Sequence, residues 1–96
     1  DDEISTGTTL ANTVHTLQRA GVRRVFAGAT HGVLCGNAIK NVAESDLEML
    51  VVANTVFVPE EKCIDKLTVL SVAPLFAEAI RRINQGESVG ELFRYD

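Results

Sequence analysis

Two adjacent carboxylates and a short loop of hydroxyl side chains stand together at the beginning of this sequence. The residues are Asp1 and Asp2, followed by Ser5, Thr6, Gly7, Thr8 and Thr9. Carboxylates accept hydrogen bonds from the neighbouring hydroxyls of a ribose, and threonine hydroxyls donate hydrogen bonds to phosphate oxygens. A helix that opens directly after the loop would add unpaired N–H groups and a positive potential. These residue types in this order predict a site for a sugar phosphate.

Both parts of this stretch also have a simpler interpretation. Paired aspartates at a chain end are commonly a solvated, mobile acidic terminus. Serine and threonine are favoured at helix N-caps, so the loop from Ser5 to Thr9 could simply begin the helix. The two interpretations of the loop are compatible, because a capped helix N-terminus keeps free N–H groups for an anion.

Helical and strand-like patterns alternate along the rest of the chain. A helix is expected from Thr8, with Gly21 in the position of a C-cap glycine. Strands are expected over 24–29, 49–53 and 66–72, helices over 33–43 and 73–84, an exposed loop at 59–62 and a short helical turn within 88–93. The run 49–53 is continuously apolar, which favours a strand buried on both faces.

This alternation with short connections predicts an α/β fold, a parallel sheet with flanking helices. In such sheets, ligands bind beyond the carboxyl ends of the strands. The loop 5–9, a turn at Thr30–His31 and the pair Asn54–Thr55 are all expected at that edge. A ligand loop of this kind normally follows a buried strand. Because the sequence begins at Asp1, we expect this first strand to be missing.

Composition narrows the class of protein. Ninety-six residues, with 46% hydrophobic and 23% charged residues, suit one soluble domain. A net charge of −4 argues against a general nucleic-acid or anionic-membrane surface. No apolar run approaches the roughly 20 residues of a membrane span, so a cytoplasmic location is expected. Cys35 and Cys63 have neither the spacing nor the companions of a zinc or redox site, which predicts two free thiols.

Four blocks of the sequence carry a resemblance to a known family. They are the opening DDEISTGTT, then ATHGVLCGNA at 29–38, VVANTV at 51–56, and AEAIRR at 77–82 followed by GESV at 86–89 and LF at 92–93. In this order they resemble the ribose-phosphate diphosphokinases, the synthetases that make phosphoribosyl diphosphate. The resemblance implies a phosphoribosyltransferase-like fold, present here as an incomplete domain. Residues 1–96 would be its C-terminal part, with the upstream catalytic half absent.

The resemblance also implies an activity and a division of roles. The intact protein would transfer diphosphate from ATP to ribose 5-phosphate in nucleotide biosynthesis, as a transferase of the kinase type. Asp1 and Asp2 would bind ribose hydroxyls, and Ser5 to Thr9 would bind the 5-phosphate. The Mg²⁺ ligands, the adenine-binding residues and the catalytic basic loop would lie upstream. No catalytic or metal-binding residue is therefore expected in this chain, which alone would be inactive.

Regulation and assembly are further expectations from the resemblance. Ser88 and Phe93 match a tail that, in regulated synthetases, helps to form a site for inhibitory ADP and activating phosphate at a subunit boundary. Dimers would assemble to a hexamer, with neither nucleic acid nor membrane as a partner. His31 would lie beside nucleotide and subunit contacts, in a binding or packing role rather than a catalytic one.

The sequence departs from the family pattern at three positions. Ser5 stands where the synthetases usually carry aspartate, Thr8 where they carry glycine, and Gly90 where a serine is usual. Two other functions stay open: a salvage phosphoribosyltransferase, which shares the first block, and a non-catalytic subunit associated with a synthetase. The C-terminal block argues against the former, and the retained Thr6, Gly7 and Thr9 argue against the latter.

Overall fold

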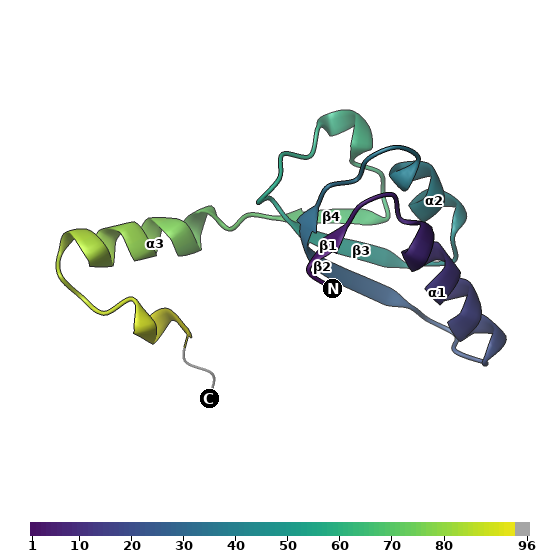
Figure 1. The fold of residues 1–96 in the computed structure, drawn as a ribbon, viewed down its shortest axis with the longest axis horizontal. Helices are drawn as coiled ribbons and strands as arrows, with labels where there is room; N and C mark the ends of the chain where they lie inside the picture. The colour runs from purple at the N-terminus through teal and green to yellow at the C-terminus, as the bar shows by residue number, and fades with distance from the viewer. Residues whose placement is uncertain (94–96) are drawn as a thin grey trace.

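The computed structural model describes residues 1–93 and contains one sheet, two helices packed against it and a third helix apart from it (Figure 1). Its elements are β1 (Glu3–Ile4), α1 (Thr8–Arg19), β2 (Phe26–Gly32), α2 (Ala38–Glu44), β3 (Met49–Ala53), β4 (Leu67–Leu70) and α3 (Ala73–Asn84), with 3-10 turns at Glu60–Lys62 and Gly90–Phe93. The strands are parallel and lie in the order β1-β2-β3-β4. The predicted α/β class is confirmed.

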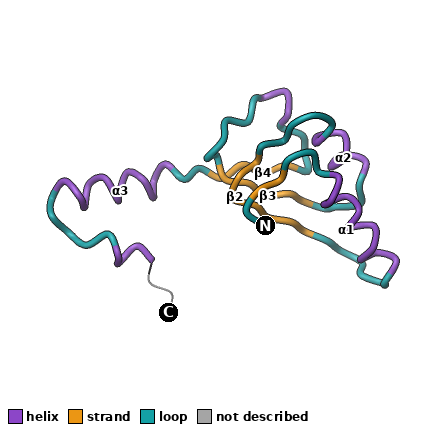
Figure 2. The backbone as a smooth tube through the Cα atoms, in the orientation of Figure 1, coloured by secondary structure: helices purple, strands orange, loops and turns teal. Residues whose placement is uncertain are grey.

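The core lies between α1, α2 and one face of the sheet (Figure 2). Fully buried side chains come from both helices, from β3 and from two loops, and include Val14, Leu34, Ala38, Val42, Leu47, Leu50 and Val52. Burial alternates along β3, where Leu50 and Val52 are buried and their neighbours are half-buried. The expectation that this strand is buried on both faces is therefore wrong, because within residues 1–93 the helices pack on only one side of it.

Three boundaries differ from the sequence-based expectation for reasons that lie elsewhere in the chain. A two-residue strand, β1, is present where none was expected, and it pairs with His31 and Gly32. This pairing extends β2 to Gly32, so His31 lies in a strand and not in a turn. The following helix starts late, at Ala38, because Leu34 and Gly36 have left-handed backbones with φ of 50° and 57°.

Helix α3 forms as predicted but does not pack on the sheet. None of its residues is buried, and the side chains of Leu75, Phe76, Ile80 and Ile83 are 45–68% exposed. Figure 1 shows the helix extending away from β4 and the chain turning back beyond it. The Cα radius of gyration is 16.4 Å, whereas a compact domain of this length would have about 12–13 Å. Within residues 1–93, no helix is long and apolar enough to cross a membrane.

Gly32 provides a test of how closely β2 and β3 approach. A Cβ atom at this position would lie 3.0–3.2 Å from three side-chain atoms of Val52, which is fully buried. We expect Gly32→Ala to lower the free energy of unfolding by about 1–3 kcal/mol through overpacking, measured by urea denaturation.

Gly28→Ala is the matched control on the same strand. Its added Cβ would meet nothing nearer than the Val51 carbonyl oxygen, at 3.9 Å. We expect this variant to be as stable as the wild type, or slightly more stable, because alanine restricts the unfolded chain. Equal losses of stability in both variants would contradict the close approach at Gly32.

Candidate functional site

The carboxyl ends of all four strands meet at one edge of the sheet. Ile4 is aligned with Gly32, Val52 with Ala29, and Ala53 with Leu70. An isolated bridge joins His31 to Asn54 across the same edge. The loop 5–9, His31 and Asn54–Thr55 therefore converge as the sequence predicted.

The loop after β1 rests on the segment that joins β2 to α2. Val33 and Leu34 both donate their backbone N–H groups to the Ile4 carbonyl at 3.1 Å, and Cys35 donates its own to the Ser5 carbonyl at 3.1 Å. The Asn41 side chain donates to the Thr6 carbonyl at 2.8 Å. Three successive carbonyls are thus directed toward the same side.

This arrangement determines where the loop presents its N–H groups. In a trans peptide the N–H group points opposite to the carbonyl of the same unit, and residues 1–93 contain no cis peptide. The N–H groups of Ser5, Thr6 and Gly7 therefore point away from the β2–α2 segment. The first N–H groups of α1 follow them directly and have no partner within the helix. A row of N–H groups directed to one side is suited to binding an anion.

Gly7 sits at the junction between the loop and α1. It is buried, is the N-cap residue of the helix, and has a left-handed φ of 76°. A Cβ here would find only ordinary contacts, at 3.5 Å or more, so it is the backbone angle and not the space that requires glycine. No side chain caps the helix, which corrects the expectation of a Ser or Thr N-cap. The hydroxyls of Thr6 and Thr8 instead lie 3.2 Å apart.

The loop borders a cavity of about 620 Å³. Its lining includes most of the sequence-predicted substrate residues, namely Asp1, Asp2, Ser5, Thr6, Gly7 and Thr9. Thr8 does not line it. Ser5 also contacts Cys35, with 3.1 Å between Oγ and Sγ. The cavity therefore brings hydroxyl groups, outward N–H groups and carboxylates together in one place.

Residues of the site that were missed from the sequence include Thr13, Phe26 and Asn41. Thr13 and Phe26 line the cavity, and Asn41 supports its floor through Thr6. Thr13 follows Thr9 by one helical turn, a spacing that could have identified it. Nothing in the sequence around Phe26 or Asn41 marks them, because each joins the site only through the fold.

His31 is tied to the end of β3 rather than left free in the site. Its Nδ1 lies 2.6 Å from the Thr55 hydroxyl, and that hydroxyl donates to the Thr30 carbonyl. The Thr55 hydroxyl therefore links the His31 ring to the backbone of β2. The neighbouring Asn54 accepts the backbone N–H of Val72 at 2.8 Å and so fixes the start of α3.

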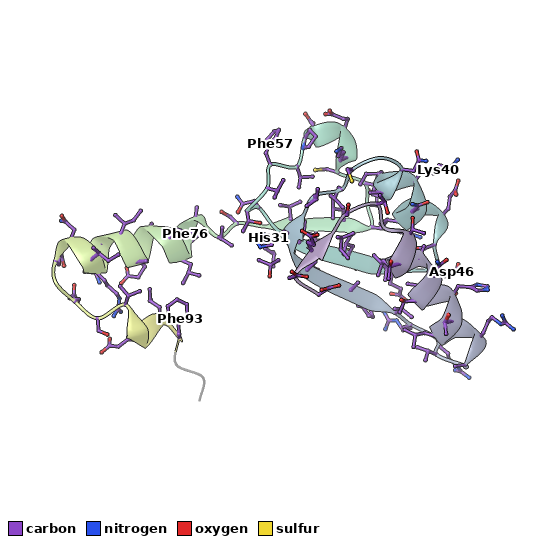
Figure 3. The ribbon with its side chains drawn as sticks, in the orientation of Figure 1. His31, Lys40, Asp46, Phe57, Phe76 and Phe93 are labelled. Carbon is purple, nitrogen blue, oxygen red and sulfur yellow. The ribbon has the colours of Figure 1, made fainter. Side chains whose placement is uncertain are left out.

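The predicted effector residues Ser88 and Phe93 lie far along the chain from this cavity, beyond α3. Figure 3 shows Phe93 on the returning segment beside α3, and both side chains are exposed. Two arginines hold this segment: Arg81 bonds Glu87 at 2.8 Å, and Arg82 bonds the Ser88 carbonyl at 2.9 Å. The tail is therefore fixed to α3 and not to the sheet.

Cys35 and Cys63 are both free thiols, and both are exposed. Within residues 1–93, no three His, Cys, Asp or Glu side chains gather in a way that could hold a metal ion.

Comparisons with known proteins give consistent results. A family model described as the phosphoribosyl synthetase-associated domain matches residues 1–94. The ribose-phosphate pyrophosphokinase of Caldanaerobacter subterraneus subsp. tengcongensis is 50% identical over 97% of this chain and 29% of its own length. That of Rhodopirellula baltica is 43% identical over 98% of this chain and 30% of its own length.

A solved structure is similar as well. The crystal structure of phosphoribosylpyrophosphate synthetase from Mycobacterium smegmatis matches 90% of this chain with a TM-score of 0.87 and 42% identity. The match covers 29% of that protein. The chain thus spans less than a third of the length of the relatives that it matches.

The ion pairs of α3 predict an acid-sensitive tail. Hydrogen bonds from Arg81, and then from Arg82, lower the pKa of Glu78 from 4.5 to about 2. Because the folded pKa lies below the ordinary one, the stabilising contribution is complete above about pH 4.5 and is lost as the pH falls toward 2. We expect a carboxyl NMR titration to give a midpoint near 2 for Glu78, rising toward 4.5 in Arg81→Gln. A wild-type midpoint near 4.5 would show that the pairs are not formed in solution.

Proposed function

This chain belongs to the phosphoribosyl synthetase-associated domain family, and on that premise we propose that it is the C-terminal part of a ribose-phosphate diphosphokinase. The whole protein would transfer the terminal diphosphate of ATP to the anomeric hydroxyl of ribose 5-phosphate, giving phosphoribosyl diphosphate and AMP for nucleotide biosynthesis. The observation that carries the proposal is the row of outward N–H groups from Ser5 to Gly7, beside a cavity that Asp1 and Asp2 also line.

In this proposal the chain supplies the site for the sugar phosphate. The N–H groups of the loop and the hydroxyls of Thr6 and Thr9 hold the 5-phosphate, while Asp1 and Asp2 accept hydrogen bonds from the ribose hydroxyls. Holding ribose 5-phosphate at both ends fixes the direction of its anomeric hydroxyl. Such positioning is a main part of catalysis in phosphoryl-type transfer, where the protein does little covalent chemistry.

The remaining parts of the reaction are proposed to lie outside these residues. Mg²⁺ would accompany the ATP phosphates, which commonly provide several of its ligands, and cationic side chains elsewhere in the protein would stabilise the transferred diphosphate. The chain by itself would bind ribose 5-phosphate without reacting. We further propose a cytoplasmic enzyme that assembles as a homo-oligomer.

The tail is proposed to bind an effector. Ser88 and Phe93 are exposed on a segment that Arg81 and Arg82 hold against α3, and this segment is separate from the loop at residues 5–9, here called the phosphate loop (Figure 1). A nucleotide such as ADP, or inorganic phosphate, would bind there at a subunit boundary. Because the two regions are distinct, an effector could change the activity without occupying the substrate cavity.

A second candidate function is a non-catalytic subunit associated with a synthetase. The family that matches this chain is described as synthetase-associated, and this description favours the second candidate. The subunit and the enzyme would share the fold described above. They differ in activity: the full-length enzyme would form AMP from ATP and ribose 5-phosphate, and the subunit would not.

Thr9→Val tests the proposed function in the full-length protein. The change keeps the shape of the side chain and removes one hydroxyl from the phosphate site. We expect the affinity for ribose 5-phosphate to fall by about 1–3 kcal/mol in titration calorimetry, through loss of a charge-assisted hydrogen bond. Thr16→Val, farther along α1 and outside the cavity lining, should bind like the wild type. Unchanged affinity in Thr9→Val would exclude the hydroxyl from the site.

Gly90→Ser tests the role of the tail. A Cβ at Gly90 would lie 3.4 Å from Ser88 Oγ, so a serine fits. A new hydrogen bond to a phosphate oxygen would tighten inhibition by ADP by somewhere between a few-fold and about a hundredfold. Steady-state kinetics at varied ADP should show this with an unchanged KM for ribose 5-phosphate. Equal changes in both constants would mean that the tail has only a packing role.

A further inference from the structure

The side chain of Asn41 lies on α2, directly behind the phosphate loop. Its Nδ2 donates to the main-chain carbonyl of Thr6 at 2.8 Å. The two preceding carbonyls, of Ile4 and Ser5, are held by backbone N–H groups of the β2–α2 segment. The Thr6 carbonyl differs from these two because its partner is a side chain. A single substitution can therefore remove its hydrogen bond.

The peptide between Thr6 and Gly7 depends on this bond for its orientation. While Asn41 holds the carbonyl, the Gly7 N–H group points away from α2 and joins the anion-binding row. Glycine adopts left- and right-handed backbone angles with similar ease, so this peptide can rotate at little cost once the bond is lost. A rotated peptide would direct a carbonyl oxygen, instead of an N–H group, toward a bound anion.

We propose that Asn41 is a positioning residue for the phosphate of ribose 5-phosphate, acting through the Thr6–Gly7 peptide. The inference rests on the proposed function of the loop. Asn41 orients the Gly7 N–H group before the substrate arrives, and its effect is confined to the phosphate end of the substrate. Its loss therefore weakens binding of ribose 5-phosphate and leaves the transfer step unchanged.

The experiment uses the full-length protein with Asn41→Leu and Asn41→Asp. Leucine has a similar volume and no donor, while aspartate places a carboxylate against the Thr6 carbonyl. We expect the KM for ribose 5-phosphate to rise about tenfold in Asn41→Leu and further in Asn41→Asp. The kcat and the KM for ATP should stay within about twofold, a pattern that simple loss of folded protein, which lowers kcat, would not produce.

Asn37→Asp is the matched control, because it makes the same chemical change as Asn41→Asp on the same segment. The Asn37 side chain is exposed and caps no N–H group. Its KM for ribose 5-phosphate should match the wild type. Hydrogen exchange of the peptide covering residues 5–10 gives a second readout that does not depend on turnover. Inorganic phosphate should slow this exchange in the wild type and not in Asn41→Leu.

The outcomes distinguish failure of the positioning role of Asn41 from failure of the proposed function. Wild-type KM values and wild-type protection by phosphate in both Asn41 variants would overturn the positioning role and leave the proposed function intact. A fall in kcat at unchanged KM would overturn it as well, because the residue would then matter only for folding. Failure of the wild-type protein to bind ribose 5-phosphate or phosphate at the loop would overturn the proposed function itself.

Discussion

Three consecutive main-chain carbonyls, from Ile4 to Thr6, are held on one side of the loop by groups that come from the β2–α2 segment and from α2. In an extended strand, successive carbonyls point to alternate sides, so this arrangement requires the chain to bend immediately after β1. The bend turns the N–H groups of the same peptides outward, next to the open N-terminus of α1. The row of outward N–H groups thus comes from the backbone of the loop, and Ser5, Thr6 and Thr9 line the cavity beside it.

The supporting segment is itself held in an uncommon conformation. Leu34 has a left-handed φ of 50°, which costs energy for a residue with a Cβ. Two features compensate for this cost: the Leu34 side chain is fully buried, and Lys62 donates its Nζ–H to the Leu34 carbonyl at 2.8 Å. Gly32, just before it, lets β2 lie close against Val52. The segment that supports the loop 5–9 therefore depends on packing in the core and on a contact with the loop before β4.

A junction of small polar side chains lies between the sheet and α3. Asn54, at the end of β3, accepts the N–H group of Val72, and Ser71 accepts that of Ala73. From this junction α3 leaves the sheet with its apolar side chains exposed. Its arginines bond the returning segment, so the helix and the tail form one unit beside the sheet.

Local patterns in the sequence determined the elements that depend on neighbouring residues. The bounds of β3 and α3, the start of α1 at Thr8 and the glycine that follows its C-cap were predicted correctly, because apolar periodicity and glycine act within a few residues. The order of helices and strands gave the parallel sheet, and the resemblance of four blocks led to the family. The candidate site was recognised as a short run of residue types, with its geometry unspecified.

Only the tertiary structure decided how the loop from Ser5 to Thr9 is oriented. The bond between Asn41 and Thr6 joins positions 35 residues apart, and the pairing of β1 with His31 and Gly32 extends β2 beyond its local signal. The left-handed backbone at Leu34 delays α2, and the helices cover one face of the sheet, so β3 is buried on one side. Each of these features depends on contacts between distant segments. A sequence pattern encodes the preference of a residue for a conformation, while the partner that satisfies its backbone groups is chosen by the packing of the whole fold.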